Sequence, residues 1–267
     1  MTYTRENPLR MISLGWGVQS WTLAAMVALK RLPPVDFAIH ADTTHEFAGT
    51  YEHAVKYTPW LEENGVKVVT VEANRPEVVA DGGVTSVMIP AFTTDRDTGS
   101  PGQIRRQCTH DWKIMPIRRY LRTVVKVAPG VVHSLQGISL DEFSRMRTSD
   151  VAYIKNVYPL VELRLTRSDC MLWLESEGLD IPPKSACTFC PYHSLGHWKD
   201  LKRAGGSDWE RAVGVDDAIR DKRPKAELFI HPARVPLEGA VKIPEDYGAS
   251  QLEMELEAPC DGGVCFV

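Results

Sequence analysis

Short apolar runs alternate with longer amphipathic segments along the first third of the chain. The apolar runs predict strands at residues 10–14, 36–41 and 66–72, because each is short and is bounded by glycine, proline or polar residues. Residues 19–31 and 50–63 place apolar side chains at helical spacing and predict helices. Strands and helices in strict alternation are typical of a parallel sheet covered on both faces. The pattern therefore predicts an α/β fold with a doubly wound, mostly parallel sheet of the Rossmann-like kind.

Residues 81–107 break this alternation. Glycine, threonine, aspartate and arginine crowd there with little periodicity, which predicts a long loop. A loop of that length in a compact domain is usually functional or disordered, so it is a candidate lid or substrate-contact loop.

The alternation resumes beyond this loop and then gives way to a different region. Pro116 predicts the start of a helix, residues 131–138 a strand and residues 168–177 a further helix. A loop-rich region with a Cys-x-x-Cys pair follows, and then an acidic tail. We expect two parts, an α/β domain at 1–165 and a C-terminal cysteine-bearing region at 166–267.

Composition narrows the class of protein. The chain has 267 residues, enough for one α/β domain with an appendage or for two small domains. Its net charge of −4 argues against a generic DNA-coating protein. The polar N-terminus lacks the apolar segment of a signal peptide, and no apolar run approaches the roughly 20 residues of a membrane helix. We expect a cytoplasmic protein that does not contact a membrane.

A glycine-rich turn joins the first predicted strand to the first predicted helix. Glycines let a backbone approach closely, and a helix N-terminus offers unpaired N–H groups, so the turn is a candidate phosphate site. It contains neither the Gly-Lys-Ser/Thr of a P-loop nor G-x-G-x-x-G, and an ordinary turn remains open. The candidate nucleotide-binding residues here are Ser13, Leu14, Gly15, Trp16, Gly17, Gln19 and Ser20.

Two further loops carry polar groups after predicted strands. Asp42 and Thr43 follow the second strand, at the edge where open α/β sheets bind ligands, although either residue also suits a helix N-cap. Gly137 opens a loop with two acids and Arg145, which suits magnesium, an anion or a solvated surface equally well.

The six cysteines suggest metal or redox chemistry more than a disulfide framework, because no secretion signal is present. Cys187 and Cys190 have the spacing to bind zinc or an iron–sulfur cluster, or to form a redox dithiol. Nearby His193 and His197 keep zinc open. Additional ligand candidates are Cys108 and the tail residues Cys260 and Cys265, whereas Cys170 lies in an apolar helical pattern and is expected to be a buried small residue.

Taken in order, these motifs resemble the PP-loop ATP pyrophosphatase superfamily, in its phosphoadenosine phosphosulfate reductase-like branch. The resemblance covers roughly residues 10–195 and implies the adenine nucleotide alpha hydrolase-like fold. The matching segments are Gly15–Ser20, Asp42-Thr43, Cys108 through Lys113 to Pro116, Gly137 through Asp141-Glu142 to Arg145, and Tyr158-Pro159-Leu160 through Cys190.

The sequence departs from that family pattern at several positions. Trp16 stands where a glycine is usual, Gln19 where an aspartate is common, and Ser139 where an arginine would hold phosphate or sulfate. Gln107 precedes Cys108 where adenylyl-sulfate reductases have a second cysteine, and the tail cysteines lack the Glu-Cys-Gly context of the reductases. These departures favour sulfur insertion over sulfonucleotide reduction.

The resemblance thus implies an ATP-dependent, pyrophosphate-releasing sulfurtransferase that uses ATP, Mg²⁺ and a 4Fe–4S cluster. Cys108, Cys187 and Cys190 are the implied cluster ligands, with Cys260 or Cys265 as a fourth ligand or as a nucleophile, and Lys113 and Arg145 are candidate catalytic cations. Two alternatives stay open: a phosphosulfate reductase-like oxidoreductase, and a non-catalytic nucleotide-binding module stabilised by zinc.

Partners beyond the nucleotide are less defined by the sequence. The sulfur acceptor is a nucleic acid or a small molecule, a protein donor of sulfur or electrons is compatible with the chemistry, and a homodimer is an open option. A basic face on the predicted 116–127 helix and the Arg105-Arg106 pair would suit a nucleic-acid backbone or simply solvent.

Overall fold

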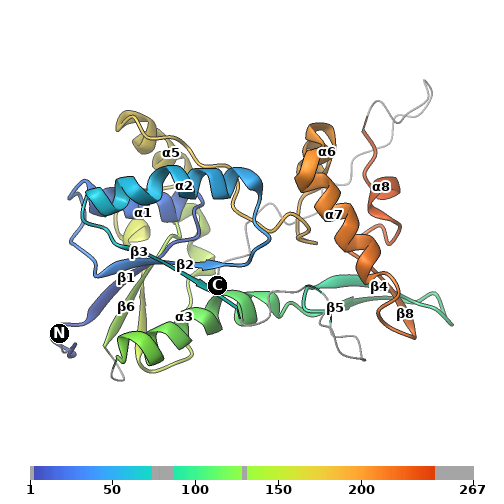
Figure 1. Cartoon of the computed structure of the whole chain (residues 1–267), viewed down its shortest axis with the longest axis horizontal. Coiled ribbons are helices and arrows are strands. Elements are labelled where there is room, and N and C mark those ends of the chain that lie inside the picture. Colours follow the sequence, from blue (N-terminus) through green and yellow to red (C-terminus); the bar gives the residue numbers. More distant parts are fainter. Residues whose placement is uncertain (1–2, 74–77, 79–86, 128–130, 244–267) are drawn as a thin grey trace. The chain divides into compact units, whose positions relative to one another are not determined.

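The computed structural model describes residues 3–73, 78, 87–127 and 131–243 (Figure 1). These residues group into two compact units. The first contains residues 3–73, 111–127 and 131–185, and the second contains residue 78 with 87–110 and 186–243. Within this part of the chain, no helix is both long and apolar enough to cross a membrane.

This grouping differs from the expected boundary at residue 165. Helix α5 (Arg167–Ser176) packs against helix α1 (Val18–Ala28) and so belongs with the first unit. Residues 87–110, which precede much of the first unit in the sequence, belong with the second.

The first unit is built on a five-stranded sheet in which all neighbouring strands are parallel. This confirms the α/β, mostly parallel fold predicted from the sequence. The strand order across the sheet is β3 (Val68–Glu72), β2 (Phe37–Asp42), β1 (Leu9–Ser13), β6 (Val132–Gln136) and β7 (Ile154–Val157).

Helices cover both faces of this sheet. Alternate residues of β1 enter two different apolar cores: Leu9 and Met11 face one, and Ile12 faces the other. Helix α1, α2 (Ala48–Glu63) and α5 lie over the Ile12 face, while α3 (Met115–Tyr120) and η2 (Leu121–Val125) lie over the opposite face (Figure 1). Nearly every residue of α1 is buried, because this helix is sandwiched between the sheet and α5.

The helix predicted to begin at Pro116 begins earlier. A π-helical turn η1 (Thr109–Ile114) runs directly into α3 and then into η2, so the helical backbone continues to Val125. Shorter helical segments of the first unit are η3 (Leu140–Arg145) and α4 (Pro159–Glu162).

The prediction of an irregular loop at 81–107 is wrong for its second half. Strands β4 (Ala91–Asp95) and β5 (Pro101–Ile104) form an antiparallel hairpin, and β8 (Ala226–Phe229) pairs with the other edge of β4. The Asp95 carboxylate accepts hydrogen bonds from the backbone N–H groups of Asp97 and Thr98, which fixes the turn. Residues 81–86 lie outside the described residues.

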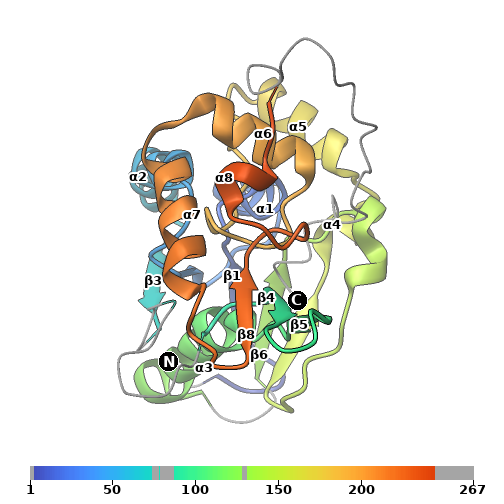
Figure 2. The same ribbon diagram turned by 90° about the vertical axis from the view of Figure 1, so that its right-hand side faces the viewer.

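The second unit is also more regular than the predicted loop-rich region. It contains α6 (Leu195–Ala204), α7 (Gly206–Ile219) and α8 (Leu237–Ala240), with α7 beside β8 (Figure 2). Buried Asp216 of α7 accepts hydrogen bonds from the N–H groups of Ile230 and Leu237 and pairs with Arg220. One carboxylate thus fixes α7 to the segments that follow β8.

Candidate nucleotide-binding site

The strand order of the sheet brings two loops to its centre. Strands β2 and β3 lie on one side of β1, and β6 and β7 lie on the other, so the direction of winding reverses between β1 and β6. Open parallel sheets bind ligands outside the carboxyl ends of the strands at such a reversal. The loop after β1 is the predicted Gly15–Ser20 turn, and the loop after β6 begins at Gly137.

The side chain of Ser20 holds the Gly15–Ser20 turn in shape. Its Oγ accepts a hydrogen bond from the N–H of Gly15 (3.1 Å) and donates one to the carbonyl of Gly17 (3.2 Å). Gly17 is the N-cap of α1 and, having no side chain, provides no cap hydrogen bond. The first turn of α1 therefore presents N–H groups without a capping side chain, which is the arrangement that binds anions at helix N-termini.

Gly137 lies directly against this helix start. A Cβ at position 137 would be 2.6 Å from the amide nitrogen of Ser20 and 2.8 Å from its Cα. Both of these are backbone atoms, so no side-chain rotation relieves the overlap. Only glycine permits the end of β6 to approach α1 this closely.

The backbone of Trp16 explains why the resemblance places a glycine at this position. Trp16 has φ of +57°, in the left-handed region that costs most side chains about 1 kcal/mol or more. Its indole is fully buried and contacts the rings of Trp21 and His53, with centroids 6.1 and 5.9 Å away. Burial of a large aromatic ring offsets the backbone cost.

Ser13 is the last residue of β1 and Leu14 follows it, and the backbone of Leu14 is hydrogen-bonded to residues of β2. The N–H of Leu14 donates to the carbonyl of Ile39 (2.8 Å), and its carbonyl faces Nδ1 of His40 (3.0 Å). Burial lowers the pKa of His40, so this imidazole is neutral and donates from Nδ1. These contacts anchor the turn to the sheet.

Asp42 is the last residue of β2, and one oxygen of its carboxylate accepts hydrogen bonds from the protein. Its Oδ1 accepts hydrogen bonds from the N–H of Thr44 (2.7 Å) and from the hydroxyl of Tyr51 (2.8 Å). Burial is the main cause that raises the pKa of Tyr51, and the Asp42 carboxylate raises it further. The phenol therefore stays protonated and donates its hydrogen bond. No hydrogen bond within the described residues engages Oδ2.

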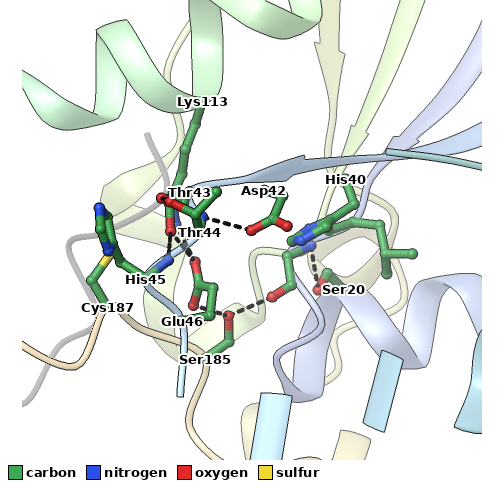
Figure 3. A network of polar contacts seen from close by, with 12 residues as sticks. Ser20, His40, Asp42, Thr43, Thr44, His45, Glu46, Lys113, Ser185 and Cys187 are labelled. Carbon is green, nitrogen blue, oxygen red and sulfur yellow. Dashed lines mark hydrogen bonds and ion pairs between the residues drawn. The ribbon is translucent and has the colours of Figure 1, made fainter. Parts of the chain in front are cut away.

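A buried carboxylate that the sequence analysis did not single out lies next to Asp42. Glu46 is 1% exposed and forms an ion pair with Lys113 (3.2 Å) (Figure 3). Its Oε1 accepts a weak hydrogen bond from Thr43 (3.5 Å), and its Oε2 accepts one from Ser185 (3.3 Å). Because Ser185 also contacts the carbonyl of Gly15, predicted residues Lys113 and Thr43 are connected to the phosphate-loop candidate.

A second polar network begins at Gln19, which is 7% exposed. Its amide nitrogen donates to Glu142 (3.1 Å) and to Ser139 (3.4 Å), and its amide oxygen accepts from Arg167 (2.9 Å). Glu142 in turn pairs with Arg145 at 2.7 Å. The two predicted catalytic cations thus belong to different networks, Lys113 with Glu46 and Arg145 with Glu142.

Of the residues that the structure adds to the site, Arg167 and Ser185 had no local sequence signal, whereas Glu46 had one. Glu46 follows Asp42 closely in the chain, and its position after a strand end was a usable cue. Arg167 and Ser185 are far from the turn in sequence and sit in unremarkable segments. Only tertiary packing brings them to it.

The Cys-x-x-Cys pair lies in the second unit together with Cys108. The backbone turns between the pair, with the N–H of Cys190 donating to the carbonyl of Cys187 (3.1 Å), and His193 contacts that same carbonyl through Nε2 (3.0 Å). Across the described residues, no three His, Cys, Asp or Glu side chains come together in a group that could hold a metal ion. Cys108, Cys187 and Cys190 therefore do not form a ready three-thiolate site, and Cys260 and Cys265 lie outside the described residues.

Cys170 behaves as the sequence predicts. It is fully buried in α5, and burial raises the pKa of its thiol to about 11. This thiol is therefore a packing residue.

No protein-family model matches this sequence, and no curated protein matches it. Among solved structures, the chain is similar to the U34-tRNA thiolase NcsA from Methanococcus maripaludis with its [4Fe-4S] cluster. The identity is 15%, the TM-score is 0.42, and the match covers 82% of this chain and 67% of that one.

Proposed function

We propose that this chain is an ATP-dependent enzyme of the PP-loop type, which adenylates an oxygen of its acceptor and releases pyrophosphate. The observation that carries this proposal is the packing of Gly137 on Ser20. It places the loop after β6 against the uncapped N-terminus of α1, at the reversal point of a parallel sheet. This is where an α/β sheet binds a phosphate-bearing ligand.

Asp42 is the residue we expect to hold Mg²⁺. It lies at the carboxyl end of β2, and its Oδ2 makes no hydrogen bond within the described residues, while Tyr51 and Thr44 fix the carboxylate through Oδ1. Magnesium is commonly bound by one or two carboxylates together with substrate phosphates. A single well-oriented carboxylate therefore fits a metal that arrives with ATP. The ion would offset negative charge on the departing pyrophosphate.

In the adenylation step, the acceptor oxygen attacks the α-phosphorus of ATP. The bond from that phosphorus to the bridging oxygen breaks, pyrophosphate leaves, and any proton that the acceptor loses on attack passes to solvent. Charge develops on the leaving pyrophosphate, where the N–H groups at the start of α1 would stabilise it. Ser20 and Gly137 keep those N–H groups in place, and Glu46 and Ser185 keep Lys113 near the same turn.

We further propose that sulfur displaces AMP from the adenylated acceptor, which makes the enzyme a sulfurtransferase. The support is the set of three cysteines in the second unit and the motif resemblance. Because these cysteines do not form a ready metal-binding group in the described residues, we derive no step through an iron–sulfur cluster.

Pyrophosphate release from ATP tests the adenylation step. The Gly137→Ala variant would force the β6 loop away from Ser20, and displacements of about 1 Å can lower a rate by about 100-fold. The matched control is Gly214→Ala, since a Cβ at Gly214 in α7 meets nothing within 4 Å. Equal turnover by Gly137→Ala and the wild type would contradict the site assignment. Sulfite release from a phosphosulfate with thioredoxin would instead favour the reductase alternative.

A further inference from the structure

The backbone of Arg167 is held firmly at the start of α5. Thr166 caps this helix through a reciprocal capping box with Asp169. The N–H of Arg167 donates to the carboxylate of Asp141 (2.9 Å), in the η3 segment that follows Gly137. The backbone of Arg167 is therefore fixed relative to both α5 and the β6 loop.

Most N–H donors of the partly exposed Arg167 guanidinium make no hydrogen bond to the described residues. A guanidinium carries five N–H donors. Within the described residues, the guanidinium of Arg167 makes one hydrogen bond, from Nη1 to the amide oxygen of Gln19, and no ion pair. Arg118, by contrast, pairs with Asp150 through both terminal nitrogens, and Arg145 pairs with Glu142.

Gln19 is too fully bonded to be a phosphate ligand itself. Both donors of its amide point at protein oxygens, one at Glu142 and one at Ser139, and its oxygen is held by Arg167. Because Gln19 lies in the first turn of α1, its amide holds the guanidinium beside the uncapped end of that helix. The neutral amide can contact a carboxylate and a guanidinium at once, which an aspartate or a glutamate here would not do.

We propose that Arg167 binds the polyphosphate chain of ATP and that Gln19 is its positioning residue. This inference rests on the proposed function and adds a residue to it. Planar guanidinium groups bind phosphate oxygens through paired, charge-assisted hydrogen bonds. The other donors of Arg167 make no hydrogen bond to the described residues, and its contact with Gln19 holds the guanidinium at the first turn of α1, whose N–H groups would bind the same anion.

Calorimetric binding of ATP and of inorganic pyrophosphate to the full chain tests this assignment. Arg167→Gln should lower the affinity for both ligands by about tenfold to a hundredfold, because losing a hydrogen bond to a charged group reduces binding by about that factor. Adenosine should bind with its affinity changed by less than about twofold, because it has no phosphate. Arg167→Lys should recover only part of the loss, since an ammonium cannot form the paired contact. The control is Arg31→Gln, which removes the same charge from an exposed surface pair with Glu177.

Gln19→Met provides a second variant that leaves Arg167 in place. It keeps the length of the side chain but removes the amide that orients the guanidinium, so ATP affinity should fall, measured at a temperature at which the variant is fully folded. Wild-type ATP affinity in both Arg167→Gln and Gln19→Met would overturn the assignment of Arg167 and leave the proposed function standing. A wild-type chain that neither binds ATP nor releases pyrophosphate would overturn the proposed function as well.

Discussion

Glu46 and Lys113 form an ion pair that is almost wholly removed from solvent. The Lys113 Nζ lies 3.2 Å from Oε1 of Glu46, and the side chains are 15% and 1% exposed. Thr43 donates to the same oxygen, Oε1, and the hydroxyl of Ser185 contacts the other oxygen, Oε2. A buried carboxylate is tolerated only when paired and hydrogen-bonded in this way, so the pair helps to hold the segment after β2 beside η1.

Lys113→Met should destabilise the chain strongly, because it leaves the Glu46 charge buried without its cation. We expect a loss of about 3 kcal/mol or more in the free energy of unfolding. The double variant Glu46→Gln/Lys113→Met should lose less, since no unpaired charge remains. Urea unfolding measures both values. Lys56→Met is the control: Lys56 pairs with Asp180 on the surface, and such pairs contribute about 1 kcal/mol or less. A Lys113→Met effect no larger than that of the control would contradict this account.

Exchanging the amide of Gln19 with the carboxylate of Glu142 tests the hydrogen bond between these two side chains. Gln19→Glu alone places a carboxylate about where an amide nitrogen now lies, 3.1 Å from Oε2 of Glu142, and the like charges should destabilise the fold by about 1–2 kcal/mol. Adding Glu142→Gln reverses the hydrogen bond and should restore most of the stability. Double-mutant analysis of unfolding free energies gives the coupling. Additive effects of the two substitutions would show that these side chains do not interact.

Trp16→Gly separates backbone strain from side-chain packing in the turn. Glycine relieves the left-handed φ of +57°, but the indole that packs on Trp21 and His53 is lost. Deleting a buried aromatic ring costs about 3–5 kcal/mol, more than the strain that is relieved, so we expect net destabilisation. Thermal unfolding measures the balance. A variant that is more stable than the wild type would mean that strain outweighs packing.

Stability should fall when the pH drops from 6.5 towards 4. Burial lowers the pKa of His53 and of His231 to about 4 from the ordinary value of 6.5. Between these values the unfolded chain binds protons at both histidines and the folded chain does not, so acid favours unfolding. His53→Phe should make the unfolding free energy less dependent on pH in this window, as measured by urea titrations at pH 7.5 and 5.0. An unchanged dependence would show that His53 does not contribute to it.

Metal analysis after anaerobic purification tests the cofactor expected from the motif resemblance. About four iron atoms with matching acid-labile sulfide per chain would support the cluster. Cys187→Ala and Cys190→Ala should then lose iron, while Cys170→Ala should retain it because Cys170 packs inside α5. One zinc per chain without iron would instead make the cysteine pair structural, and adenylation would stand without cluster-dependent sulfur transfer.

The sequence determined the α/β class, the positions of β1, β2 and β3 and the location of the Gly15–Ser20 turn. These features depend on local periodicity and on backbone requirements within a few residues, which a single segment already displays. The same local logic identified Asp42 at a strand end and Cys170 as a buried residue. Short strands with polar and glycine residues, such as β5, gave no such signal, because their pairing partners supply the stabilisation.

Tertiary structure alone decided which distant residues meet at the turn. The pairing of β1 with β6 brings Gly137 onto Ser20, and the packing of α5 on α1 brings Arg167 to Gln19. It also grouped 87–110 with the C-terminal residues through the β4–β8 pairing. Such contacts join segments that are far apart in the chain, and their free energy comes from packing and hydrogen bonds that form only once the chain has folded. No local pattern in the sequence encodes them.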